Sequence, residues 1–399
     1  MSVSYYDGRR RTVLTNQKHL FSLPDGEHYL NCAYMSPTPK TVVEAGIGGI
    51  MRKAAPSGIH ADDFFRDNET VRQLFARLIG ASAPERVAIV PAASYGIATV
   101  ARNLAFARGQ NIVVADGQFP SNVYAWREAA RRHGVDLRTV TPPEHVQRGE
   151  EWTTRVIEAV DSETVVVASA PVHWTDGTCF DLEAIGARAR DCDAAFVVDG
   201  TQAVGAMPFD VARVQPDALV CAGYKWLLGP YSVGLAYYGP RFDGGIPLEE
   251  GWAARRGSDD FRRLIDYQDD YHPGALRYDV GERSNFVLMP MLLAALEQVL
   301  AWDLQDVQAY CHAITTDLFD AVRDLGFGVE SDEWRAGHLF GLHAPARVDL
   351  EAVKRQLQAR KVSVSLRGSA IRVSPHVYND ASDVAALLDV LRDHVGHDA

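Results

Sequence analysis

The stretch Val220-Cys-Ala-Gly-Tyr-Lys-Trp-Leu-Leu-Gly-Pro230 places one lysine in the middle of an apolar run. The residues just before it, 217–222, have the composition of a short buried strand. Lysine is rarely buried unless its charge is paired. Lys225 is therefore either a surface or ion-paired residue, or an amine placed at a strand end for chemistry.

A carboxylate ends the preceding apolar run. The run Ala195–Val198 leads into Asp199, and Lys225 lies 26 residues after this aspartate. Alone, Asp199 also fits a helix N-cap or a turn. Because ligands bind at the carboxyl ends of parallel strands, the two strand ends would present an anion and an amine to one cleft. A desolvated lysine forms Schiff bases readily, and a carboxylate keeps a pyridine nitrogen protonated. The pair therefore predicts pyridoxal phosphate as the cofactor.

Pyridoxal phosphate also needs a site for its phosphate group. The segment Val90-Pro-Ala-Ala-Ser-Tyr-Gly-Ile97 has the form of a strand end, a turn of small residues and a helix start. Free backbone N–H groups and the helix dipole bind anions at such a start. As an alternative, Ser94 at the expected N-cap would only cap its own helix.

The fold class follows from how apolar runs and helical segments alternate. From about residue 85, β-branched and nearly unbroken runs recur, which is typical of strands buried on both faces of a mostly parallel sheet. They lie at 87–90, 111–115, 164–168, 195–198, 219–221 and 233–238. Helical spacing occurs between several of them, at 97–104, 121–133 and 182–190. We therefore expect an α/β protein.

After Asn285 the pattern changes to that of a smaller α/β domain. Helices are expected at 288–300, 307–325 and 350–360 and from 382 onward, with strands at 338–342, 362–366 and 371–374. We expect three parts: an N-terminal arm (1–40), a large cofactor-binding domain (41–284) and a small C-terminal domain (285–399).

Composition excludes several classes of function. The chain has 399 residues, 47% of them apolar and 23% charged, and a net charge of −12. This charge argues against a nucleic-acid or membrane partner, and no apolar run reaches the length of a spanning helix. The N-terminus lacks the apolar core of a secretory signal, so a cytoplasmic location is expected. The five cysteines are scattered without a Cys-x-x-Cys pair, so neither disulfides nor a metal site is expected.

The strings Val198-Asp-Gly-Thr-Gln-Ala-Val-Gly205 and Gly223-Tyr-Lys-Trp-Leu-Leu-Gly-Pro230 resemble the class V aminotransferases, which are pyridoxal-phosphate enzymes of fold type I. The resemblance spans most of the chain and is locally closest to kynureninases and isopenicillin-N-epimerase-like members. It implies a large domain with a mostly parallel seven-stranded sheet and a smaller C-terminal domain.

The resemblance also implies roles for individual residues. Lys225 would hold the internal aldimine, and Asp199 would pair with the pyridine nitrogen. Phe119 would stack on the cofactor ring, although a core aromatic is the alternative. The other implied cofactor contacts are Ala93, Ser94, His173, Gln202 and Tyr224.

Two further residues resemble kynureninase positions that reach the phosphate from the neighbouring subunit. They are Trp252 and Asn285, and they imply a homodimer with shared active sites. A surface aromatic and a helix cap, respectively, are the alternatives. Arg372 matches the arginine that binds the substrate α-carboxylate, where a surface ion pair is the alternative. Tyr34 belongs to the segment expected at the substrate entrance.

Some positions depart from the family pattern. Ala222 and Gly223 stand where relatives carry hydroxyl groups, and the stretch 367–370 has no cysteine, so desulfuration by a cysteine nucleophile is not expected. We expect a class V aminotransferase acting on an L-amino acid. The alternatives are a kynureninase-like hydrolase or C–S/C–C lyase and an epimerase, followed by a non-catalytic binding protein.

Overall fold

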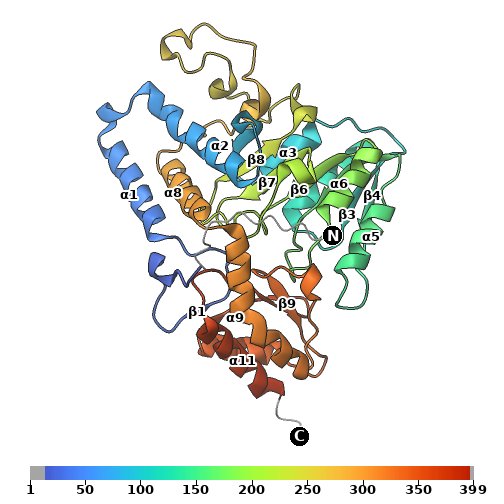
Figure 1. Ribbon diagram of the computed structural model, residues 1–399. Coiled ribbons are helices and arrows are strands. Elements are labelled where there is room, and N and C mark those ends of the chain that lie inside the picture. The colour runs from blue at the N-terminus through green and yellow to red at the C-terminus, as the bar shows by residue number, and fades with distance from the viewer. Residues whose placement is uncertain (1–13, 396–399) are drawn as a thin grey trace, which may run out of the picture.

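A computed structural model describes residues 14–395 of the protein. Residues 1–13 of the expected N-terminal arm lie outside the described residues. Figure 1 shows a large sheet with its helices in the upper part of the molecule and a smaller α/β unit below it. The expected domain boundaries near residues 40 and 285 stay predictions.

The large sheet has seven strands in the order β2-β8-β7-β6-β5-β3-β4. All neighbours pair in parallel except β8, which is antiparallel to both β7 and β2. The strands are β2 (Val87–Val90), β3 (Asn111–Ala115), β4 (Asp136–Val140), β5 (Thr164–Ser169), β6 (Ala195–Asp199), β7 (Ala218–Ala222) and β8 (Gly234–Tyr238). The predicted class and the seven-stranded, mostly parallel sheet are confirmed.

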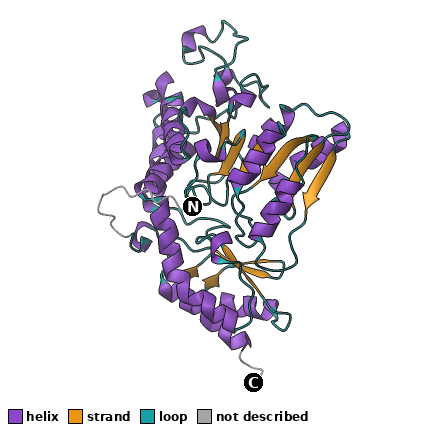
Figure 2. Cartoon of the chain, turned by 45° about the vertical axis from the view of Figure 1, so that its right-hand side comes forward, coloured by secondary structure: helices purple, strands orange, loops and turns teal. Residues whose placement is uncertain are grey.

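Helices cover both faces of this sheet (Figure 2). Alternation along β6 sends Phe196 and Val198 into one apolar core and Val197 into the other. The first core is closed by α1 (Lys40–Ala54), α2 (Arg66–Leu78), α5 (Gly149–Glu158), α6 (Leu182–Asp191), α7 (Val211–Val214) and α8 (Leu288–Ala301). The second core is closed by α3 (Ala93–Arg102) and α4 (Tyr124–His133). The sheet is therefore a fixed platform, and its strand ends hold side chains in place.

The smaller unit surrounds a three-stranded antiparallel sheet in the order β11-β12-β9. Its elements are β9 (Phe340–His343), β11 (Ser365–Arg367), β12 (Ala370–Val373), α9 (Leu304–Asp324), α10 (Leu350–Ala359) and α11 (Ala381–Val395). The strand expected at 362–366 is split in two. Its first part, β10 (Val362–Ser363), pairs with β1 (His28–Tyr29) of the N-terminal segment, which ties that segment to the small unit.

Within residues 14–395, no helix is both long and apolar enough to cross a membrane. The same residues contain no group of three or more histidine, cysteine or acidic side chains that could hold a metal ion.

Candidate active site

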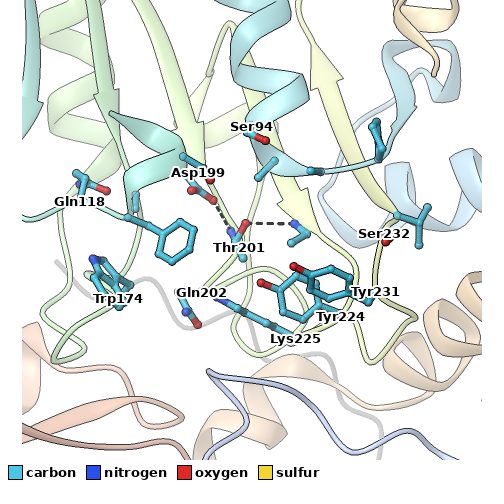
Figure 3. Close-up of a pocket in the computed structure, with 18 of the residues that line it drawn as sticks. Ser94, Gln118, Trp174, Asp199, Thr201, Gln202, Tyr224, Lys225, Tyr231 and Ser232 are labelled. Carbon is cyan, nitrogen blue, oxygen red and sulfur yellow. Dashed lines mark hydrogen bonds between the residues drawn. The ribbon is translucent and has the colours of Figure 1, made fainter. Parts of the chain in front are cut away.

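The candidate active site is a cavity of about 360 Å³ at the edge of the large sheet where β2, β3, β5, β6 and β7 end (Figure 3). Because β8 is antiparallel, its first residues reach the same edge. The sequence-predicted residues that line this cavity are Ala93, Ser94, Phe119, Asp199, Gln202, Tyr224 and Lys225.

Lys225 comes three residues after the end of β7 and projects into the cavity. Its side chain is buried and forms no salt bridge among the described residues. Burial lowers the pKa of Lys225 to about 8, and the Asp199 carboxylate opposes that shift. Its Nζ atom lies 5.2 Å from the centroid of the Phe119 ring. The lysine is therefore a desolvated amine that loses its proton near pH 8, well below the usual range for lysine.

Asp199 is the last residue of β6 and lies beside the end of β7. Its Oδ1 accepts a hydrogen bond from the backbone N–H of Thr201 at 3.0 Å. The hydroxyl of Thr201 in turn accepts from the backbone N–H of Ala222 at 3.1 Å, which links the two strand ends. Burial raises the pKa of the Asp199 carboxyl, and the bonds to Thr201 and the charge of Lys225 oppose this. Any cation or protonated nitrogen at this end of the cavity would be stabilised by it.

The start of α3 forms another wall of the cavity. Ala92 at the N-cap provides no side-chain hydrogen bond to the helix. The first backbone N–H groups, those of Ala93 and Ser94, therefore face the cavity edge without a capping side chain, which is the arrangement that binds phosphate. Tyr224 lies nearby, and its ring centroid is 4.5 Å from that of Tyr231.

Gln202 is held at three points. Its Oε1 accepts from the indole N–H of Trp226 at 2.9 Å, and its Nε2 donates to the carbonyl of Ala33 at 3.1 Å. Its backbone carbonyl lies 2.8 Å from Nε2 of His338. Because an indole nitrogen only donates, the amide orientation of Gln202 is determined, and one amide N–H is left for a ligand.

His173 does not line the cavity. Its Nδ1 lies 2.7 Å from the hydroxyl of Thr175, and its Nε2 lies 3.1 Å from the backbone carbonyl of Asp116. The ring packs against Trp152 instead. The next residue, Trp174, lines the cavity in its place, with its ring centroid 5.3 Å from that of Phe119.

Four other predicted residues also lie outside the cavity lining. Trp252, in a 3-10 turn (Trp252–Ala254), packs on Phe64, Phe65 and Phe261. Asn285 accepts from two backbone N–H groups at the start of α8. Tyr34 is exposed, and Arg372 is buried on β12 behind Trp174. The proposed partner-subunit roles of Trp252 and Asn285 stay predictions.

Sequence reasoning missed several residues that line the cavity. Thr201, Trp174, Gln118, Tyr231 and Ser232 all do so. The last two immediately precede the antiparallel strand β8, and a search limited to carboxyl ends of strands overlooks them. The signal available was the position of Tyr231 and Ser232 just before the run expected at 233–238.

Comparison with known proteins identifies the family of this chain. Residues 28–387 match the family described as Aminotransferase class-V. The chain belongs to this family. Isopenicillin N epimerase of Amycolatopsis lactamdurans is 25% identical over 96% of this chain and 98% of its own length. Kynureninase of Monosiga brevicollis is 28% identical over 82% of this chain and 76% of its own length.

Solved structures share the fold of this class V protein. The apo structure of a cysteine desulfurase from Thermococcus onnurineus NA1 has a TM-score of 0.82 at 22% identity, covering 96% of this chain and 98% of that one. A C-DES mutant with glycine covalently linked to its PLP cofactor has a TM-score of 0.84 at 19% identity, covering 95% and 100%. The predicted fold type I is confirmed.

Pyridoxal phosphate is the cofactor of this family, as the lysine and aspartate pair predicted. The cavity fits that group at both ends. The uncapped start of α3 supplies N–H donors for a phosphate, and Asp199 supplies a buried carboxylate for a pyridine nitrogen. Lys225 would hold the cofactor's carbonyl carbon, with Phe119 beside the ring.

Proposed function

We propose that this class V protein is an aminotransferase that acts on an L-amino acid through Lys225. The observation that supports this most directly is one cavity that contains a buried amine with a pKa of about 8 and a buried carboxylate on the neighbouring strand end. When bound, pyridoxal phosphate supplies an electron sink for the bonds at the substrate Cα.

The residues of the chain would divide the remaining tasks. Lys225, uncharged in part near neutral pH, would remove the proton from the substrate Cα and deliver it to the cofactor's carbonyl carbon. Asp199 stabilises positive charge at the far end of the cavity. Phe119 and Trp174 form an apolar wall that limits water around the reacting carbon.

Arg372 would bind the substrate α-carboxylate. Its side chain is buried, donates to the carbonyl of Trp174 at 2.9 Å and to the hydroxyl of Ser365 at 3.3 Å, and leaves its Nε–H without a partner. Those bonds hold the guanidinium next to Trp174, which lines the cavity. A guanidinium placed this way retains enough donors to bind a carboxylate with two hydrogen bonds.

The cysteines do not support desulfuration by a cysteine nucleophile. None of the five lines the cavity, and Cys32, Cys221 and Cys311 are buried. Burial raises the pKa of Cys32 to about 12 and that of Cys311 still further. A thiol that stays protonated is a poor nucleophile.

A second copy of the chain is proposed to complete the site. Helix α1 exposes an apolar stripe formed by Val43, Ile47, Ile50 and Met51. Trp252 is partly exposed and packs on Phe64 and Phe65, just before α2 begins. Burial of such a stripe favours a homodimer, in which Trp252 and Asn285 of one subunit would approach the phosphate of the other.

The decisive test is Lys225→Ala. Purified wild-type protein with pyridoxal phosphate is expected to show the visible absorbance of lysine-bound cofactor, and the variant to lack it. Turnover should fall by about 10²- to 10⁴-fold, because the general base is removed. Lys354→Ala, an exposed lysine of α10, is the matched control. Visible absorbance that persists unchanged in Lys225→Ala would contradict the assignment.

A panel of L-amino acids without an added 2-oxo acid separates the reaction types. An aminotransferase converts each amino acid to one equivalent of 2-oxo acid per site and then stops, with its visible absorbance lost. Adding a 2-oxo acid should restore both the turnover and the visible absorbance. Continued product release without an acceptor would indicate a lyase or hydrolase, and loss of optical rotation without release would indicate an epimerase.

A further inference from the structure

The β11–β12 hairpin carries two arginines on one face. Arg372 pairs with Ser365 across the hairpin, and Arg367 pairs with Ala370. Residues two apart on a strand, and residues directly opposite across a pair, point to the same face. Arg367 and Arg372 are therefore diagonal neighbours on the same side of the hairpin.

Both guanidinium groups lie against the same indole. The Cζ atom of Arg367 is 5.2 Å from the ring centroid of Trp174, and that of Arg372 is 6.0 Å from it. Trp174 lines the active-site cavity and contacts the ring of Phe119. The two cations thus lie behind Trp174, on the small unit and outside the cavity lining itself.

Neither cation is neutralised within the described chain. Among residues 14–395 no carboxylate forms a salt bridge with Arg367 or Arg372. Arg367 donates only to the carbonyl of Leu366, at 2.8 Å, and the buried Nε of each arginine has no partner. Two like charges that are partly removed from water and lie close together repel each other unless anions bind them.

The two arginines differ in burial and in their neighbours. Arg372 is fully buried and donates to the backbone carbonyl of Trp174 at 2.9 Å. Arg367 is only half-buried, and its charge interacts with exposed Tyr34 at the expected substrate entrance. Arg372 is therefore placed for a group at the substrate Cα, and Arg367 for a group farther out.

We propose that Arg367 binds a second acidic group of the substrate, so that the protein acts on L-amino acids whose side chain ends in a carboxylate or a similar oxyanion. This rests on the proposed function, in which Arg372 binds the α-carboxylate. The indole of Trp174, which lines the cavity, holds both guanidinium groups behind it by cation–π contact. Charge-assisted hydrogen bonds from Arg367 would then discriminate acidic from neutral side chains.

The test compares matched amino acids on the enzyme loaded with pyridoxal phosphate. L-aspartate, L-glutamate and L-2-aminoadipate are measured beside L-asparagine, L-glutamine and L-norleucine. At least one acidic member should exceed its neutral counterpart by about 10- to 100-fold in kcat/KM. Arg367→Met keeps an apolar stem over Trp174 and should remove that preference while changing kcat/KM for neutral amino acids less than about threefold.

Controls separate recognition from folding. Arg367→Lys, which keeps the charge, should retain part of the preference, and Arg355→Met removes an exposed arginine of α10 and should change nothing. Thermal melting checks that each variant folds. An equal loss for acidic and neutral substrates in Arg367→Met, or no acidic preference in the wild type, would overturn the proposal.

A second readout does not depend on turnover. Glutarate should bind the loaded wild type at least about tenfold more tightly than butyrate in calorimetry, and Arg367→Met should bind the two equally. Equal binding of both ligands to the wild type overturns the proposal. If the visible absorbance of lysine-bound cofactor never forms, the proposed function fails instead, and the two failures are thus distinguished.

Discussion

The site has one charged group at the large sheet and another at the small unit, and the two differ in whether their charges are paired. At the large sheet, Lys225 and Asp199 are a potential cation and an anion that face one cavity, and each moderates the pKa shift of the other. At the small unit, Arg367 and Arg372 are two cations without an acidic partner in the described chain. The first end, which we call the balanced end, has opposite charges facing each other before a substrate arrives. The second end, which we call the unbalanced end, needs bound anions to neutralise its two cations.

The supporting structure differs in the same way. Asp199 and Lys225 follow adjacent strands buried between two apolar cores, so their separation is set by the sheet. Arg367 and Arg372 lie on a short hairpin that contacts Trp174 of the large unit through the bond from Arg372 to the Trp174 carbonyl and through both guanidinium groups on the indole. In the proposed function, chemistry at Cα would thus depend on the rigid end, and substrate choice would depend on the hairpin.

The largest effect is expected from breaking the balanced end. Asp199→Asn keeps an oxygen for the Thr201 N–H but removes the charge, so kcat should fall by about 10²- to 10³-fold. Cofactor should still bind, because Lys225 and the start of α3 are unchanged. Steady-state kinetics and the visible spectrum measure this, with exposed Asp389→Asn as the control. A kcat within threefold of wild type would show that Asp199 has no part in the reaction.

At the unbalanced end, Arg372→Leu should lower kcat/KM by about 10²-fold for every amino acid. The reason is that all substrates share the α-carboxylate, whereas only acidic ones would use Arg367. Rates for the same matched amino acids measure the contrast. A loss confined to acidic substrates would exchange the roles assigned to the two arginines.

The balanced end also has a cost to stability when the cofactor is absent. The pKa of Lys225 is about 8 in the folded chain against an ordinary 10.5, so the unfolded state binds the proton more tightly. Apoprotein Lys225→Met should therefore be more stable than wild type by up to about 3 kcal/mol below pH 8.

That gain should disappear with rising pH. Between pH 8 and 10.5 the wild-type lysine is neutral when folded and protonated when unfolded, so wild-type stability rises with pH and approaches that of the variant. Denaturant unfolding of both apoproteins at pH 7, 9 and 10.5 measures this. A difference that does not shrink with pH would mean that Lys225 is not desolvated.

The sequence predicted the balanced end better than the unbalanced one. Unbroken apolar runs identify β6 and β7, and position at a strand end is enough to bring Asp199 beside Lys225. The edge strand β4 was missed, because its residues are half-exposed and include Asp136 and Arg138. The role proposed for Arg367 depends on the register of the β11–β12 hairpin, and no local sequence pattern reveals which residues such a hairpin places together.

The smallest expected effect concerns a contact that joins the two ends. His338, just before β9, is fully buried, and burial lowers its pKa to about 4, so the ring is neutral. The amide of Gln308 donates to its Nδ1 at 2.9 Å, so its Nε2 carries the proton donated to the Gln202 carbonyl. The ring also packs edge-on against Trp226 at 4.5 Å. His338 therefore fixes Gln202 from the small unit, while Trp226 fixes it from the large one.

His338→Phe keeps the ring packing and removes both hydrogen bonds. Leaving the Gln202 carbonyl and the Gln308 amide unpaired should lower the free energy of unfolding by about 2 kcal/mol. Cofactor affinity should weaken by less than about tenfold, because Gln202 retains its bonds to Trp226 and Ala33. Chemical denaturation and cofactor titration test this, with exposed His133→Phe as the control. A loss of affinity as large as that of Lys225→Ala would mean that the small unit, rather than the sheet, positions the cofactor.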